Sequence, residues 1–247
     1  MKLTIFFLVV LTLLFFVTTQ SQTHKVFTDV LQKYVKYGLV DYKAFKQDQK
    51  FETYLNKLSN TDLSQLSERE ELAFWINTYN AFTLKAIIDN YPVKSINDIK
   101  YGEKSVWDED FIPINKKKYS LNEIEHKILR VRFDEPRIHF AIVCASISCP
   151  ALRNEAFDAN KLEAQLQEES VRFLTDKDRN DFDLSKRTAY LSKIFDWFDE
   201  DFGKNDKEIL QFVSKFLPDN IKKDMLENTD KWKINYKDYN WNLNEIK

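Results

Sequence analysis

The segment between Ser67 and Pro92 constrains the fold most, because its pattern predicts a long helix that is apolar on opposite faces. Ser67 and Glu70 have the spacing of a capping box, and the helix is expected to end at Asn90, before Tyr91-Pro92. At about 100° per residue, apolar side chains cover two opposite arcs and leave a narrow polar wedge. The arcs hold Leu72, Trp75, Ile76, Tyr79, Phe82, Ala86 and Ile87, and Phe74, Ala81, Leu84 and Ile88; the wedge holds Glu71, Thr78, Lys85 and Asp89. Such a helix must run through the core.

The remaining patterns predict a helix-rich protein with few strands. Only 3 glycines and 5 prolines occur, which disfavours β-sandwiches and glycine-rich phosphate loops. Ser120 and Glu123 form a second capping box, which opens a helix ending near Arg130. The stretch from Ile138 to Cys144 is apolar on both faces, as a central strand covered on each side requires. We therefore expect an α+β fold: a helix-rich single domain over residues 22–247 around a small sheet with one central buried strand.

The first 21 residues have the pattern of a secretory signal peptide. Lys2 precedes an apolar run from Leu3 to Val17, and the small residues Thr19 and Ser21 stand at a spacing that a signal peptidase accepts. The run is shorter than the ~18 residues of a spanning helix. We expect cleavage before Gln22, export to the periplasm or the exterior, and no stable membrane insertion afterwards. An uncleaved anchor is the alternative.

The charge balance disfavours nucleic acid as a partner. Lysine and arginine number 37 against 39 acidic residues, which gives a formal net charge of -2 and no strong field to steer a polyanion. The expected partner is instead a small peptide, a glycan or a protein. No cofactor or metal is expected, because the paired spacings of zinc motifs are absent around His126, His139 and Cys149.

Several segments carry a resemblance to a known family. They are the run from Ala73 to Ala81, the run from Glu125 to Arg130, the run from His139 to Pro150, the pair Asp201-Phe202, and Tyr239-Asn240-Trp241. Together, and in this order, they resemble the domain-of-unknown-function family 547, and an exported bacterial member is expected. The resemblance implies no activity. In plant relatives Ser-Asp-Pro often stands where this chain has Ser148-Cys149-Pro150, so thiol chemistry does not follow from the family.

Cys149 and His139 are the candidate nucleophile and general base. Cys149 precedes Pro150 and is expected at a helix N-cap, where the backbone N–H groups and the helix dipole favour a thiolate. His139 is expected on the preceding strand, where a folded-back loop brings it to Cys149. Asp201 and Glu125 fall among apolar residues of their helices, so each needs a partner, and either is a candidate to orient the histidine.

Less reactive interpretations stay open beside this one. Export favours a disulfide between Cys144 and Cys149 that locks the loop between them, and inert thiols are a further alternative. His139 is open to being a satisfied core histidine, Glu125 and Asp201 to being partners in core ion pairs, and the aromatic residues to being core.

The sequence supports two main functions. The first is an exported thiol hydrolase or acyl transferase acting on an amide or ester. The second is a non-catalytic module that binds a peptide, glycan or protein through polar side chains, with Asn77, Asn80, His126 and Ser148 as candidate binding residues. A purely structural exported protein is the third interpretation.

Overall fold

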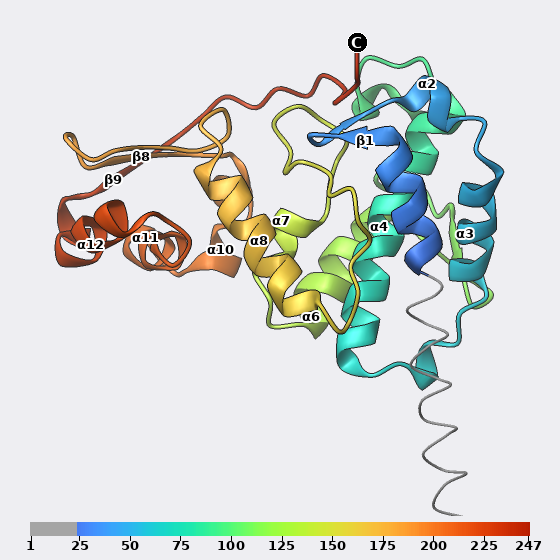
Figure 1. The fold of residues 1–247 in the computed structure, drawn as a ribbon, viewed down its shortest axis with the longest axis horizontal. Helices are drawn as coiled ribbons and strands as arrows, with labels where there is room; N and C mark the ends of the chain where they lie inside the picture. The colour runs from blue at the N-terminus through green and yellow to red at the C-terminus, as the bar shows by residue number, and fades with distance from the viewer. Residues whose placement is uncertain (1–23) are drawn as a thin grey trace, which may run out of the picture.

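The long helix α4, Glu68–Asn90, lies at the centre of the N-terminal half of the molecule (Figure 1). The structure is a computed structural model that describes residues 24–247, so the expected signal peptide at residues 1–21 lies outside the described residues. Ser67 and Glu70 form the expected capping box, and 16 of the 23 residues of α4 are buried. The prediction of a helix through the core is confirmed.

The other elements are short. In chain order they are a helix over residues 24–34, β1 Val35–Lys36, β2 Leu39–Val40, α2 Tyr42–Phe45, α3 Gln49–Ser59, a 3-10 turn Leu63–Gln65, α4, a 3-10 turn Ile96–Asp98, β3 Lys100–Tyr101, β4 Lys104–Ser105, β5 Ile112–Ile114, β6 Lys117–Tyr119, α5 Leu121–Glu123, a π-helical turn Ile124–Leu129, α6 Arg130–Arg132, α7 Ile138–Ala141, α8 Leu162–Thr175, β7 Asp181–Asp183, β8 Thr188–Leu191, α9 Ile194–Trp197, α10 Asp199–Phe202, α11 Asp206–Ser214, α12 Asp219–Glu227, a 3-10 turn Thr229–Lys231 and β9 Lys233–Tyr236. Three antiparallel hairpins and the sheet β7-β8-β9, in which β8 and β9 are parallel, make up the strands. The helix-rich α+β class is correct.

Two hydrophobic clusters pack around α7. The larger one surrounds α4 and includes Ile138 and Ala141 of α7. The second lies under α8, α9, α11 and β8 and includes Phe140, which stacks on Phe173 of α8 at 5.0 Å between ring centroids. Figure 1 shows α7 between the α4 half and the C-terminal half of the molecule. His139 therefore lies where the two clusters meet.

The expected central strand from Ile138 to Cys144 is wrong. Residues Ile138–Ala141 form a helical turn that ends at the extended residue Ile142, and residues 142–144 form no strand. Two backbone hydrogen-bonding groups that a neighbouring strand would satisfy are instead satisfied by Asn80 of α4. Its Nδ2 donates to the carbonyl of Ala141 (2.9 Å), and its Oδ1 accepts from the N–H of Val143 (2.9 Å). A short apolar run looks the same in a buried strand and in a buried helical turn, which explains the error.

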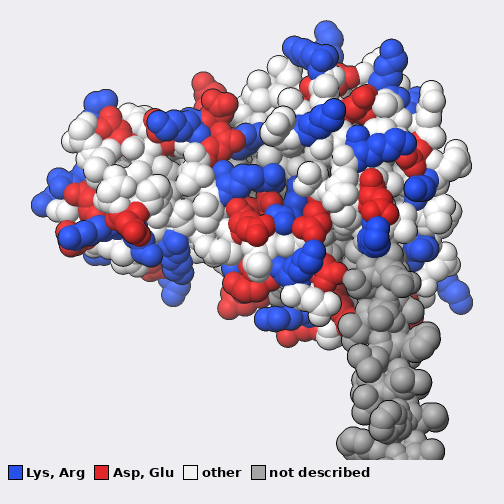
Figure 2. Space-filling model, in the orientation of Figure 1, with Lys and Arg blue, Asp and Glu red and all other residues white. Residues whose placement is uncertain are grey.

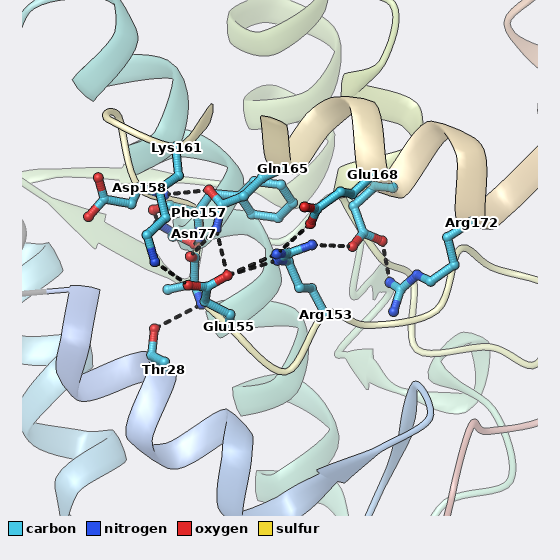
Figure 3. A network of polar contacts seen from close by, with 12 residues as sticks. Thr28, Asn77, Arg153, Glu155, Phe157, Asp158, Lys161, Gln165, Glu168 and Arg172 are labelled. Carbon is cyan, nitrogen blue, oxygen red and sulfur yellow. Dashed lines mark hydrogen bonds and ion pairs between the residues drawn. The ribbon is translucent and has the colours of Figure 1, made fainter. Parts of the chain in front are cut away.

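Asn77, one turn before Asn80, holds a second segment in the same way. Its amide donates to the carbonyl of Phe157 (2.8 Å) and accepts from the N–H of Phe157 (2.9 Å). Figure 3 shows this contact at the edge of a polar network between the 153–161 loop and α8. Arg153 is central to the network and pairs with Glu155, Glu168 and Glu169. Asn77 and the network together fix the loop after Cys149.

The C-terminal segment, residues 237–247, runs back from β9 across the molecule to the N-terminal half (Figure 1). The carbonyl of Asn244 accepts from the N–H of Val40 (2.9 Å), and Leu243 is buried in the larger cluster. On its way the segment pairs with the 144–149 loop: the N–H of Ile147 donates to Asn242, and the N–H of Asn240 donates to the hydroxyl of Ser148. The loop that carries both cysteines is thus held from outside by the last residues of the chain.

The surface carries mixed charge. On the face drawn in Figure 2, lysine and arginine side chains alternate with acidic ones over α8 and its neighbours. Within residues 24–247, no helix is long and apolar enough to span a bilayer.

Candidate active site

A cavity of about 170 Å³ opens between α4, the 121–132 helical segment, α9 and the C-terminal segment. It contains both cysteines and two of the three histidines of the chain. Its lining residues are Tyr79, Trp107, Asn122, Glu125, His126, His139, Ile142, Cys144, Cys149, Pro150, Ile194, Trp197, Phe198, Tyr239 and Trp241. Four of the residues that the sequence nominated, Cys149, His139, Glu125 and His126, therefore share one cavity.

The two sulfur atoms lie in a hydrogen-bonded group at this cavity. Cys144 Sγ lies 3.0 Å from the hydroxyl of Ser146 and 3.1 Å from that of Tyr239. Cys149 Sγ accepts a hydrogen bond from the backbone N–H of Cys144 (2.8 Å), and the two side chains are also hydrogen-bonded to each other. Both cysteines are free thiols in this structure, and Cys149 is the more deeply buried of the two.

The surroundings shift the pKa values of the two thiols in opposite directions. Burial opposes ionisation of Cys144, but hydrogen bonds from Cys149, Ser146 and Tyr239 outweigh it and lower the pKa of this thiol. Burial and the adjacent Cys144 sulfur raise the pKa of Cys149 well above its ordinary value. The helix expected to begin at Cys149 does not form, because residues 150–161 are a loop and the next helix is α8. The physical argument for a thiolate therefore moves from Cys149 to Cys144.

His139 is bound to a carboxylate, as the sequence argument required. Its Nε2 donates to Asp201 Oδ2 (2.6 Å), and its ring stacks on Phe198 at 4.3 Å between centroids. Asp201 also accepts from Nε of Arg130 (2.5 Å) and from Nη2 of Arg130 (3.0 Å). Burial alone would raise the pKa of Asp201, but the bonds from His139 and Arg130 lower it to about 2. Asp201 is thus ionised at neutral pH and fixes the orientation of the imidazole.

Glu125 makes a separate contact. Its Oε2 accepts from the hydroxyl of Tyr79 in α4 (2.8 Å), and the burial of Tyr79, together with the charge of Glu125, raises the pKa of that phenol. Glu125 does not contact His139, so of the two carboxylates considered, Asp201 is the one that the structure joins to the histidine. His126 is exposed, and its Nδ1 lies 3.1 Å from Nη1 of Arg130.

A π-helical turn explains why neighbouring side chains converge here. The N–H of Arg130 bonds to the carbonyl of Glu125, five residues earlier, instead of four as in an α-helix. The extra residue rotates the rest of the helix by about 100°. An ideal α-helix would turn Arg130 to the side away from Glu125, whereas the π turn brings Arg130 round to reach Asp201. Glu125 and His126, at the start of the turn, line the cavity.

Aromatic side chains form the rim of the cavity. Trp197 is 45% exposed and packs on Tyr239 and Trp241, with ring centroids 4.8 and 5.8 Å away. Tyr239 and Trp241 lie 4.7 Å apart. Trp197 is far in sequence from the other two, and the three come together because the C-terminal segment crosses α9.

The other nominated residues lie away from the cavity. Asn77 and Asn80 are buried, and their side-chain amides bind backbone groups. Ser148 accepts from the N–H of Asn240 and does not line the cavity. Across residues 24–247, no three His, Cys, Asp or Glu side chains are grouped so that they could hold a metal ion.

Sequence reasoning missed four contributors to the site. Ser146 and Tyr239 hold Cys144, and Arg130 holds Asp201. The carbonyls of Ile147 and Cys149 are both bound by Arg179, at 2.8 and 2.6 Å. Tyr239 carried one signal, because Tyr239-Asn240-Trp241 is part of the resemblance to the family.

Residues 63–174 match the family described as "Protein of unknown function, DUF547". A DUF547 domain is present. The chain matches no curated protein and no solved structure. The DUF547 domain supplies Glu125, Arg130, His139 and both cysteines, whereas Asp201 and the aromatic rim residues Trp197, Tyr239 and Trp241 lie after the matched segment.

Proposed function

We propose that the protein is an exported bacterial thiol hydrolase or acyl transferase that acts on an amide or ester, with Cys144 as the nucleophile. The observation that carries the proposal is that one cavity of about 170 Å³ is lined both by Cys144, whose thiol is hydrogen-bonded to Ser146 and Tyr239, and by His139, whose ring binds Asp201. A nucleophile, a base and an orienting carboxylate are the parts that acyl transfer requires.

Each residue has a definite task in this reaction. Cys144 Sγ attacks the substrate carbonyl, and the hydroxyls of Ser146 and Tyr239 stabilise the thiolate before attack. Nε2–H of His139 is donated to Asp201, so Nδ1 is the ring atom left to accept the proton of the Cys144 thiol, to pass it to the leaving group, and then to take one from water or an acceptor alcohol or amine. In the described part of the chain His139 makes no direct hydrogen bond to either sulfur, so the proton moves through the substrate or a bridging water.

Cys149 has a supporting task. Its sulfur accepts the N–H of Cys144 and its side chain is hydrogen-bonded to the Cys144 thiol. Burial keeps Cys149 protonated, since its pKa is raised well above the ordinary value. Cys149 therefore stabilises the Cys144 thiolate as a donor, which replaces the nucleophilic role that its position before Pro150 indicated.

A binding module is the second candidate, and the aromatic rim favours it. Trp197, Tyr239 and Trp241 present flat apolar surfaces with polar edges, which suit the face of a sugar ring or a peptide side chain. The same rim serves the first candidate by holding the substrate next to Cys144.

The test uses reduced, folded protein and a panel of acyl esters, thioesters and peptide amides. We expect mass spectrometry to find an acyl group on the peptide that contains Cys144, and Cys144→Ser to abolish it. His139→Gln should slow product release by about 10²-fold or more. His24→Gln is the matched control, because His24 is also buried but binds Tyr54 away from the cavity. Absence of any acyl adduct, with sugars or peptides still quenching tryptophan fluorescence, would establish the binding module instead.

A further inference from the structure

The two cysteines of the chain lie close enough to act on each other. They are separated by four residues in a loop that turns back on itself: the N–H of Cys149 donates to the carbonyl of Ser146, and Ala145 has a positive φ of 56°. The turn places Cys149 Sγ 2.8 Å from the backbone N of Cys144. A disulfide between them requires the sulfurs to approach to about 2.05 Å.

The two cysteines differ in solvent exposure. Cys149 is 4% exposed, whereas Cys144 is only partly buried, and both face the same cavity. Cys144 is therefore the more accessible of the two thiols. The loop that carries Cys149 is fixed by Arg179, which binds the carbonyls of Ile147 and Cys149.

We infer that Cys144 and Cys149 form a redox-active dithiol that exchanges with low-molecular-weight disulfides, Cys144 attacking and Cys149 resolving. This activity goes beyond acyl transfer, because its substrate is a disulfide bond and no carbonyl is involved. A more accessible attacking thiol beside a buried resolving thiol is an arrangement that suits thiol–disulfide exchange.

The reaction balances in two steps. The Cys144 thiolate attacks one sulfur of a disulfide RSSR; a bond forms between Cys144 Sγ and that sulfur, the S–S bond of RSSR breaks, and RS⁻ leaves and takes up a proton. Cys149 then loses its proton to solvent and attacks Cys144 Sγ; the mixed disulfide breaks and the second RS⁻ leaves. The dithiol gives up two electrons and two protons, and RSSR becomes two RSH. The same steps run backwards when thiol is in excess.

Oxidation of the pair by thiol–disulfide exchange would also stop acyl transfer, because the oxidised pair has no thiolate to attack a carbonyl. Thiol–disulfide exchange itself does not require acyl-transfer activity. A disulfide assay contains no acyl substrate, so its outcome is independent of the acyl-transfer test.

The experiment uses the full folded chain in glutathione buffers of varied thiol-to-disulfide ratio, quenched with an alkylating reagent and read by mass spectrometry. The wild-type protein is expected to change reversibly between two alkylated thiols and none. Cys149→Ser should accumulate one glutathione on Cys144, and Cys144→Ser should acquire glutathione on Cys149 at least about tenfold more slowly. Each single variant keeps one thiol, because the chain has only 2 cysteines.

Three results would overturn the inference. One is a wild-type protein that stops at a mixed disulfide with glutathione, since the second thiol would then not resolve it. Another is a bridge that stays oxidised in buffer dominated by reduced glutathione, which is the behaviour of a structural disulfide. The third is Cys149 reacting faster than Cys144 in the single-thiol variants, which would reverse the assigned order.

Discussion

Replacing Asn80 with alanine tests how the cysteine loop is held. Asn80 is 3% exposed and is the partner of two buried backbone groups, the carbonyl of Ala141 and the N–H of Val143. Asn80→Ala leaves both groups without a partner, at about 1–3 kcal/mol each. The better helix propensity of alanine offsets about 0.5 kcal/mol. We expect a net loss of about 3 kcal/mol in the free energy of unfolding, and a fall in melting temperature of roughly 6–12 °C.

Urea and thermal unfolding followed by circular dichroism measure this loss. Asn56→Ala is the matched control, because it makes the same chemical change at an exposed position inside helix α3 and should shift stability by no more than about 0.5 kcal/mol. Asn77→Ala should be destabilising by an amount similar to Asn80→Ala, because Asn77 also holds two backbone groups. Asn80→Asp keeps the acceptor for Val143 and loses the donor to Ala141, so its loss should lie between wild type and Asn80→Ala.

The two buried asparagines should differ in one respect. Asn80 fixes the segment immediately before Cys144, whereas Asn77 fixes Phe157. In folded protein, Asn80→Ala should therefore change the alkylation rate of Cys144, and Asn77→Ala should leave it near the wild-type rate. If Asn80→Ala were as stable as Asn56→Ala, the backbone of residues 141–143 would have other partners and the reasoning would fail.

Further predictions concern the charges around the cavity. Tyr239→Phe removes a hydroxyl from Cys144 and should raise the pKa of that thiol, seen as alkylation that needs a higher pH; an unchanged pH profile contradicts the proposed donor. Asp201→Asn should lower stability at neutral pH, and because the folded-state pKa of Asp201 is lowered to about 2, the difference from wild type should shrink as the pH falls from about 4 to about 2. Asp224→Asn is the control for Asp201→Asn, because Asp224 makes a comparable two-bonded contact with Arg187 outside the cavity. Asp201→Asn should slow the catalytic step, and Asp224→Asn should leave its rate unchanged. The Arg179 guanidinium binds the carbonyls of Ile147 and Cys149 at once, and the ammonium of lysine in Arg179→Lys lacks that planar, two-armed geometry. Amide hydrogen exchange in residues 147–149 should therefore be about tenfold faster in this variant.

Local patterns are enough to predict the centre of the fold. The capping box at Ser67 and the two apolar arcs identify α4 and its burial, because both signals lie within one helix. Asn77 and Asn80 stand out as polar residues inside apolar arcs, and the structure gives both buried backbone partners. The run from Ile138 to Ala141 is misassigned as a strand because its partner is a side chain of α4, about 60 residues earlier, which no local pattern reveals.

The site is predictable only where a residue looks out of place. Asp201 stands out as a carboxylate among apolar residues that needs a partner, but the sequence cannot choose between Asp201 and Glu125 as the partner of His139, and it does not indicate Arg130. A regular helix puts Arg130 on the wrong side, because the chain makes a π turn there. Pro150 indicates the start of a helix, which favours Cys149 over Cys144 as the nucleophile. Residues 150–161 form a loop instead, so the argument from a helix N-terminus does not apply to Cys149.

The position of the site explains why its parts come from both the matched segment and the residues after it. His139 stands on α7, where the cluster around α4 meets the cluster under α8, and only the second cluster supports α10 and Asp201. Tyr239 reaches Cys144 because the C-terminal segment must cross the cysteine loop to bury Leu243 in the first cluster. The DUF547 segment therefore provides the thiols and the imidazole, while the packing of the chain after α8 delivers Asp201, which binds His139, and Tyr239, which binds Cys144. Loosening the second cluster should leave Cys144 in place and still change its reactivity, since its donor from Tyr239 would be lost along with the hold on His139.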